Sequence, residues 1–147
     1  MDDRVKRLRT PEECDIFAKN AEAMGRPDLA SQAKRRRVEL QAESSGADSA
    51  AEREALQAVY AYEEVLSQKN GRRTRATRTW QMIQRHGIIE AVERAVNRSV
   101  ETQGYRALIE MGMEDLAFEA VVSKHPHLFS EDAVKISRER LKAWKNA

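Results

Sequence analysis

The chain has 147 residues, of which 41% are hydrophobic and 34% charged, and its formal net charge is +2. This length suits one domain of ordinary size with a lean core, and the single cysteine excludes an intrachain disulfide. No apolar stretch is long enough for a signal peptide or a membrane span, so we expect a cytoplasmic protein without membrane contact.

Helix-start and helix-stop signals follow one another through the first half of the chain. Thr10 begins a capping box and predicts a helix over residues 10–24, which ends at a glycine. Residues 1–9 before it are predicted to form a basic, mobile end. A second helix is predicted over 27–43, and a long third helix over 49–68.

The second half continues the same pattern. Further helices are predicted over 77–85, 88–96, 103–111, 113–123 and the residues after Ser130. A glycine that ends one helix, followed three residues later by an acid and then by alanines, recurs at Gly25, Gly87 and Gly112. This spacing is typical of αα-hairpins. We therefore predict an all-α protein, a compact orthogonal bundle of about seven or eight helices, with a single helical domain over 10–147.

The small net charge conceals alternating blocks. Residues 39–64 carry one arginine against seven acids, whereas residues 65–100 carry eight lysines and arginines against two acids. Such alternation predicts separate acidic and basic faces. The alternative interpretation is that the blocks neutralise one another between packed helices. Both interpretations stay open for the cationic run at 34–37.

The most concentrated cationic run is residues 69–78, which contain no acid. The run lies in a loop and in the first turn of the next helix, where guanidinium groups and free backbone amides suit phosphate. Thr74, Thr77 and the adjacent Thr79 add hydroxyl donors. We therefore expect a nucleic-acid-binding protein, either DNA or RNA. Its expected phosphate contacts are Lys69, Arg72, Arg73, Arg75, Arg78 and Arg85.

Residues 79–96 also invite a helix-turn-helix interpretation, with Gly87 as the turn glycine. The second helix of that motif would carry Glu90 and Glu93, and acids there oppose the approach of phosphate. Its apolar residues are explained by core packing. Base reading by this helix is therefore the weaker hypothesis, and backbone binding by the arginines is the stronger.

Catalysis needs a base beside a nucleophile or a pair of tuned carboxylates. The histidines are His86, His125 and His127, and Cys14 lies far from them in sequence. Metal sites need three or four ligands at defined spacings, which the sequence does not show. We predict no catalytic residue, metal or cofactor, and an enzyme is the less favoured hypothesis.

A rival hypothesis is a protein-interaction module of helical hairpins, such as an adaptor, an inhibitor or an assembly subunit. In this case the acidic segment 39–64 of one chain faces the basic loop 69–78 of another, in a homo-oligomer or in a complex with an acidic protein surface. Glu63 and Glu64 within that segment are expected to form a solvated edge.

Overall fold

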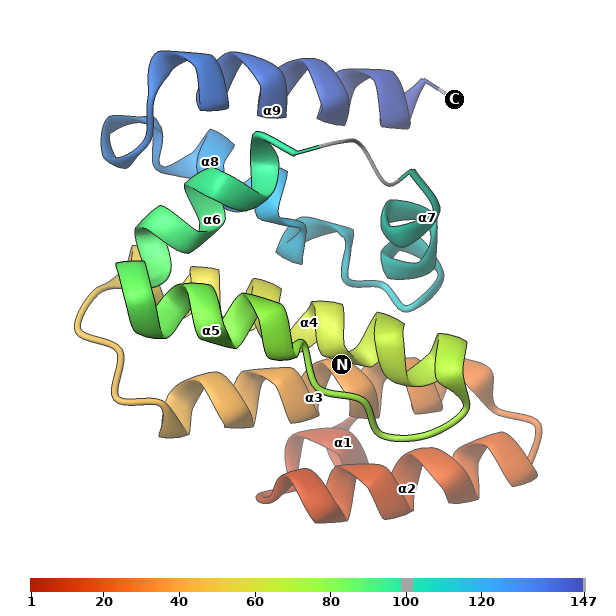
Figure 1. The fold of residues 1–147 in the computed structure, drawn as a ribbon. Coiled ribbons are helices and arrows are strands. Elements are labelled where there is room, and N and C mark those ends of the chain that lie inside the picture. Colours follow the sequence, from red (N-terminus) through yellow and green to blue (C-terminus); the bar gives the residue numbers. More distant parts are fainter. Residues whose placement is uncertain (99–101, 147) are drawn as a thin grey trace.

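The computed structural model describes residues 1–98 and 102–146. Within these ranges the regular structure is entirely helical, and the predicted all-α bundle is confirmed (Figure 1). The helices are α1 (Asp3–Lys6), α2 (Pro11–Ala23), α3 (Pro27–Ser44), α4 (Ala50–Asn70), α5 (Thr77–His86), α6 (Ile88–Val96), α7 (Thr102–Glu110), α8 (Phe118–Lys124) and α9 (Glu131–Lys145), with 3-10 helices η1 (Glu114–Leu116) and η2 (Pro126–Leu128). In the described part of the chain, none of them has the length and apolar character needed to cross a bilayer.

Side-chain caps begin the helices where the sequence predicts them. The hydroxyls of Thr10, Ser49 and Ser130 each accept a hydrogen bond from the amide three residues later, at 3.1, 3.1 and 3.0 Å. Each bond satisfies an amide that a helix start leaves unpaired. Gly71 ends α4 in the left-handed region, at a φ of 67°, which glycine adopts without steric cost.

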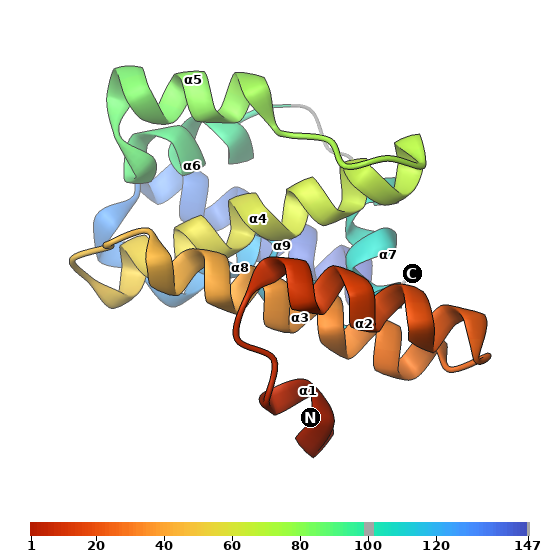
Figure 2. The ribbon, with the colours of Figure 1, turned by 90° about the horizontal axis from the view of Figure 1, so that it is seen from below.

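α4 is the central helix of the bundle. α3 packs along one side of it and is covered in turn by α2, while α6, α7 and α8 pack on the other side (Figures 1 and 2). The buried face of α4 is rich in alanine, at Ala51, Ala55, Ala58 and Ala61. Because the separation of packed helices depends on the side chains between them, these small residues allow the neighbouring helices to approach closely.

The single helix predicted over 113–123 is wrong. Ala117 is extended, with a ψ of 149°, and separates η1 from α8. Arg35 of α3 holds this turn, since its guanidinium donates to the Gly112 carbonyl at 2.9 Å and to the Asp115 carboxylate at 2.7 and 2.8 Å. A partner from a distant helix thus overrides the local helix preference.

Residues 1–9, expected to form a mobile basic end, contain α1 and lie against α3. Val5 is fully buried, and the Asp2 amide donates to the side-chain oxygen of Gln32 at 2.7 Å. The Leu8 carbonyl accepts from Arg36 at 3.1 Å. The segment therefore contributes both an apolar side chain and backbone hydrogen bonds to the packed structure.

Shortening the buried side chain in α1 tests this packing. Val5→Ala removes two methyl groups from a fully buried site, and we expect it to lower the free energy of unfolding by about 1.5 kcal/mol. Urea denaturation followed by circular dichroism measures the change. Ile16→Ala, at an exposed position of α2, is the control and should shift stability by less than about 0.5 kcal/mol. Equal stability of Val5→Ala and the wild type would contradict the packing of α1.

Candidate functional site

The side chains of the cationic run at 34–37 have partners within the chain, three of them carboxylates. Every side chain in it has a partner on another element or on the next turn of α3. The partners are Glu22 for Lys34 at 3.3 Å, Asp115 for Arg35 at 2.7 Å, the Leu8 carbonyl for Arg36 at 3.1 Å and Asp15 for Arg37 at 3.1 Å. Neutralisation by acids of the same chain is therefore observed for Lys34, Arg35 and Arg37. Arg36 donates to a neutral carbonyl and has a structural role.

The loop that joins α4 to α5 is anchored by a buried carboxylate on α4. Glu63 is only 6% exposed, and its Oε2 atom accepts from the Ala76 amide at 2.9 Å and from the Trp80 indole at 2.7 Å. A buried carboxylate needs such partners to offset its lost hydration. The prediction of a solvated edge at Glu63 and Glu64 is wrong, because the loop and α5 cover this part of α4.

Arg73 lies in an ion-pair network that joins four elements. Its guanidinium donates to the buried Glu64 of α4 and, at 2.9 Å, to Asp15 of α2. Arg37 of α3 reaches the same Asp15 oxygen at 3.1 Å. Two carboxylates thus accept from the two terminal nitrogens of Arg73, so this residue ties the loop to the body of the protein.

Ser67 fixes the middle of the same loop. Its hydroxyl accepts from the Thr74 amide at 2.8 Å and donates to the Thr74 carbonyl at 3.3 Å. The Asn70 side-chain amide adds a bond to the Thr74 hydroxyl at 3.1 Å. The loop is therefore held at its middle as well as at its end, which presets the positions of the arginines beside it.

Arg75 is held but remains open to solvent. Its guanidinium lies over the Trp80 ring, 5.4 Å from the centroid, and its Nε atom is 3.7 Å from the Glu63 carboxylate. The side chain is nevertheless 70% exposed. This combination positions a cation over an aromatic face while leaving most of its donors free.

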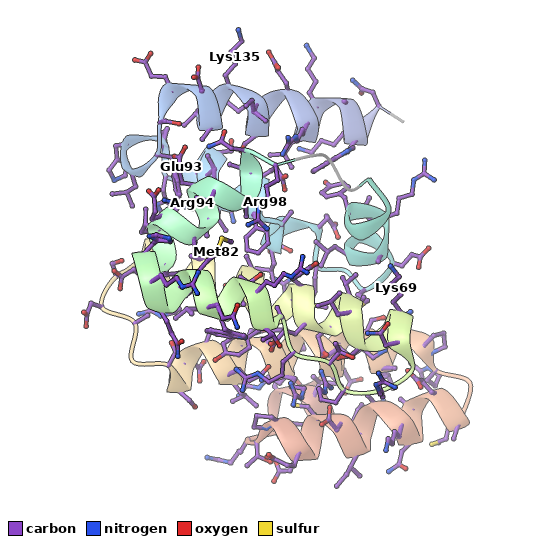
Figure 3. The ribbon with its side chains drawn as sticks, viewed as in Figure 1. Lys69, Met82, Glu93, Arg94, Arg98 and Lys135 are labelled. Atoms are coloured by element: carbon purple, nitrogen blue, oxygen red, sulfur yellow. The ribbon has the colours of Figure 1, made fainter. Side chains whose placement is uncertain are left out.

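The other predicted contacts are exposed and divide into two groups. Arg72 in the loop and Arg78 and Arg85 on α5 make no side-chain hydrogen bond or ion pair with any other described residue. Lys69 is also exposed, but it lies on the last turn of α4, at the far end of the loop from α5 (Figure 3). Arg75 therefore lies beside the start of α5, over Trp80. Arg72 lies at the α4 end of the loop, where its amide donates to the Ser67 carbonyl at 3.2 Å, and Lys69 lies on the last turn of α4.

The outward face of α5, which we call the α5 face, is polar and carries no acid. At 100° per residue its exposed members fall within an arc of about 120°. They are Thr77, Arg78, Gln81, Gln84 and Arg85. The glutamines were not among the residues predicted to bind. Their helical spacing relative to Arg78 and Arg85 is the sequence signal that places them on the same face.

α6, the second helix of the possible helix-turn-helix, is packed into the bundle. Its Val92 and Val96 are buried against α4, α8 and α9. Glu93 accepts from the Ser130 amide at 2.9 Å and from the Ser130 hydroxyl at 2.7 Å, and so binds the start of α9. The inner residues of α6 thus pack the bundle and hold the start of α9. Of the two helices α5 and α6, it is α5 that has an exposed cationic face.

The Glu93 contact predicts a pH dependence of stability. Partial burial opposes ionisation, but hydrogen bonds from Ser130 and Asn97 outweigh it and lower the pKa of Glu93 below its ordinary value. A lowered folded-state pKa gives stability that is present above the unfolded-state pKa and is lost as the pH falls through the folded value. We expect Glu93→Gln to make the loss of stability below about pH 5 less steep. Urea denaturation across pH measures this, with exposed Glu139→Gln as control, and an unchanged slope in Glu93→Gln would contradict it.

The nucleophilic and metal-ligating residue types do not converge. His125 pairs with Glu54 and lies 6.4 Å from His127, ring to ring, whereas His86 ends α5. Cys14 is buried, and this burial raises the pKa of its thiol to about 11. No group of three or more possible metal ligands forms within residues 1–98 and 102–146.

A cavity of about 580 Å³ lies behind α5. Thr79 and Met82 of α5 face it, together with aromatic side chains from α4, α7, α8 and α9. Met82 and Arg98 meet beside it, with the guanidinium 3.3 Å from the sulfur (Figure 3). Among the described residues, the inner side of α5 therefore borders this cavity, and α5 has no fully buried residue.

Comparison with known proteins adds no relative. No family model matches the chain, and neither does a curated protein or a solved structure.

Proposed function

We propose that this protein binds nucleic acid through the α5 face and the adjoining loop. The observation that carries the proposal is the set of exposed arginines at 72, 75, 78 and 85, on a surface whose helix contains no acid. Arginine forks match phosphate geometry and remain charged at every physiological pH. Polar threonine and glutamine side chains between them supply further donors to the backbone of the nucleic acid.

The anchored loop supports this proposal because binding gains when side chains are already in position. Arg73 holds the loop to α2 and α4, and Glu63 holds its end beside Trp80. In the proposal Arg73 is a positioning residue, and Lys69 is a more distant contact at the end of α4. The four remaining arginines make the principal phosphate contacts.

Salt-dependent binding tests the proposed function. Fluorescence anisotropy with labelled single-stranded and duplex oligonucleotides of about 20 nucleotides, in about 25–300 mM salt, measures the dissociation constants. Four phosphate contacts predict a slope of about −3 to −4 when the logarithm of the association constant is plotted against that of the salt concentration. Absence of binding at the lowest salt concentration would overturn the proposal.

The rival function, a helical interaction module, makes a different prediction. It requires acidic residues of one chain to meet the basic loop of another, and two of those acids, Glu63 and Glu64, already hold the loop within their own chain. This intramolecular use favours nucleic acid over self-association. Light scattering at low and high salt separates the two functions, because only the interaction module predicts a mass that falls with added salt.

A further inference from the structure

α5 lies where its exposed face could enter a groove of a nucleic acid. Figure 2 shows α5 at the edge of the bundle, and the residues on its outward side are exposed. Trp80 packs against Tyr60 of α4, with ring centroids 5.3 Å apart, while the opposite side of the helix is open to solvent. An α-helix with its side chains is about 10–12 Å wide, and the major groove of B-form DNA is about 12 Å wide.

The residue types on this face are those that read base edges. Gln81 and Gln84 are exposed and make no side-chain hydrogen bond to another described residue. They lie about 4.5 Å apart along the helix axis, between one and two base steps of about 3.4 Å each. Glutamine forms paired hydrogen bonds with adenine, and arginine forms them with guanine.

We propose that α5 reads the major groove of double-stranded DNA, with Gln81 and Gln84 as the base-reading residues and the loop arginines on the flanking phosphates. This inference rests on the proposed function and specifies its ligand. Arg78 and Arg85 lie on either side of the glutamines along the helix. They span about 10 Å of its axis, which places cations toward both strands at the edges of the groove.

Two observations favour B-form DNA over the other nucleic acids. Recognition of single strands relies on exposed aromatic side chains that stack on bases. Every Phe, Tyr and Trp of this chain is buried or largely buried, and the Trp80 ring is already covered by Arg75. The major groove of A-form RNA is too deep and narrow for protein side chains to read, so a helix face of this kind suits a DNA duplex.

A selection experiment with paired variants tests the inference. A library of random duplexes is bound by the protein and sequenced, and anisotropy then compares an enriched duplex with its scrambled form, a single strand and an RNA duplex. We expect the enriched DNA duplex to bind at least tenfold more tightly than each of the others. The variant Gln81→Ala/Gln84→Ala should lose this preference, by about five- to 150-fold per residue, while its affinity for scrambled DNA and its salt slope stay unchanged.

Gln68→Ala, at an exposed glutamine on the last turn of α4, is the matched control and should retain the preference. The inference fails if no sequence is enriched, if single strands or RNA bind equally well, or if the double variant keeps its preference. In each of these cases salt-dependent binding persists, and the proposed function stands. Absence of binding to every probe at low salt is a different result, and it overturns both.

Discussion

Replacing Arg72, Arg78 and Arg85 together with glutamate should weaken nucleic-acid binding by at least about 100-fold at low salt. These three side chains are exposed and make no bond to another described residue, so their replacement removes phosphate contacts without breaking an internal pair. Each reversal also adds repulsion against the DNA backbone. Anisotropy titration measures the loss, and circular dichroism checks that the helical content is kept.

The triple variant leaves out Arg73 because this arginine forms ion pairs within the protein. Arg73→Glu would place a third carboxylate beside Glu64 and Asp15, so a loss of binding in that variant would not distinguish contact from unfolding. Arg73 is therefore left intact.

A control variant separates local contact from total charge. Arg7→Glu/Arg106→Glu/Lys135→Glu changes the net charge by the same amount, at exposed residues of the N-terminal segment, α7 and α9. Figure 3 shows Lys135 directed away from α5. The control should lose only a small part of the affinity, through the long-range field. If the two triple variants bind equally, the α5 face has no special role.

Glu63→Ala should lower the free energy of unfolding by about 3 kcal/mol, the largest stability effect that we expect. The change leaves the Ala76 amide and the Trp80 indole without their acceptor, and both lie in a buried or half-buried setting. Urea denaturation measures the loss. Fluorescence emission of Trp80 should shift toward longer wavelength if the indole becomes exposed to water.

Two companion variants define the cause. Glu63→Gln keeps a side-chain oxygen that can accept from the indole, so it should recover a substantial part of the stability. Glu139→Ala removes an exposed carboxylate from the middle of α9 and should change stability by less than about 0.5 kcal/mol. A loss in Glu63→Ala no greater than that in Glu139→Ala would show that the buried carboxylate does not hold the loop.

Local chemistry made the helix boundaries predictable. Thr10, Ser49 and Ser130 cap helices through bonds to amides three residues later, and Gly71 ends α4 in a conformation that favours glycine. These interactions join neighbours in sequence, so a pattern of residues is enough to identify them.

The sequence pattern could not predict ion pairs between residues that are far apart in the chain. Arg73 meets Asp15 across 58 positions, and Arg35 meets Asp115 across 80. The first pair gives Arg73 a structural role, and the second divides the helix predicted over 113–123. The burial of Glu63 has the same origin, because only the folded chain brings the loop and Trp80 over it.

The cavity behind α5 has a consequence for the energy landscape of the protein. α5 buries no residue fully. It is held by the Glu63 bonds at its start, by the packing of Trp80 against Tyr60 and by the turn at Gly87, where φ is 83°. The alanine-lined packing of α4 does not depend on it. Beyond its anchored start, we expect α5 to open at a lower free-energy cost than the other helices, and amide hydrogen exchange would measure this difference. A ligand that binds only the ordered helix would then bind more weakly, because part of the binding free energy is used to order α5.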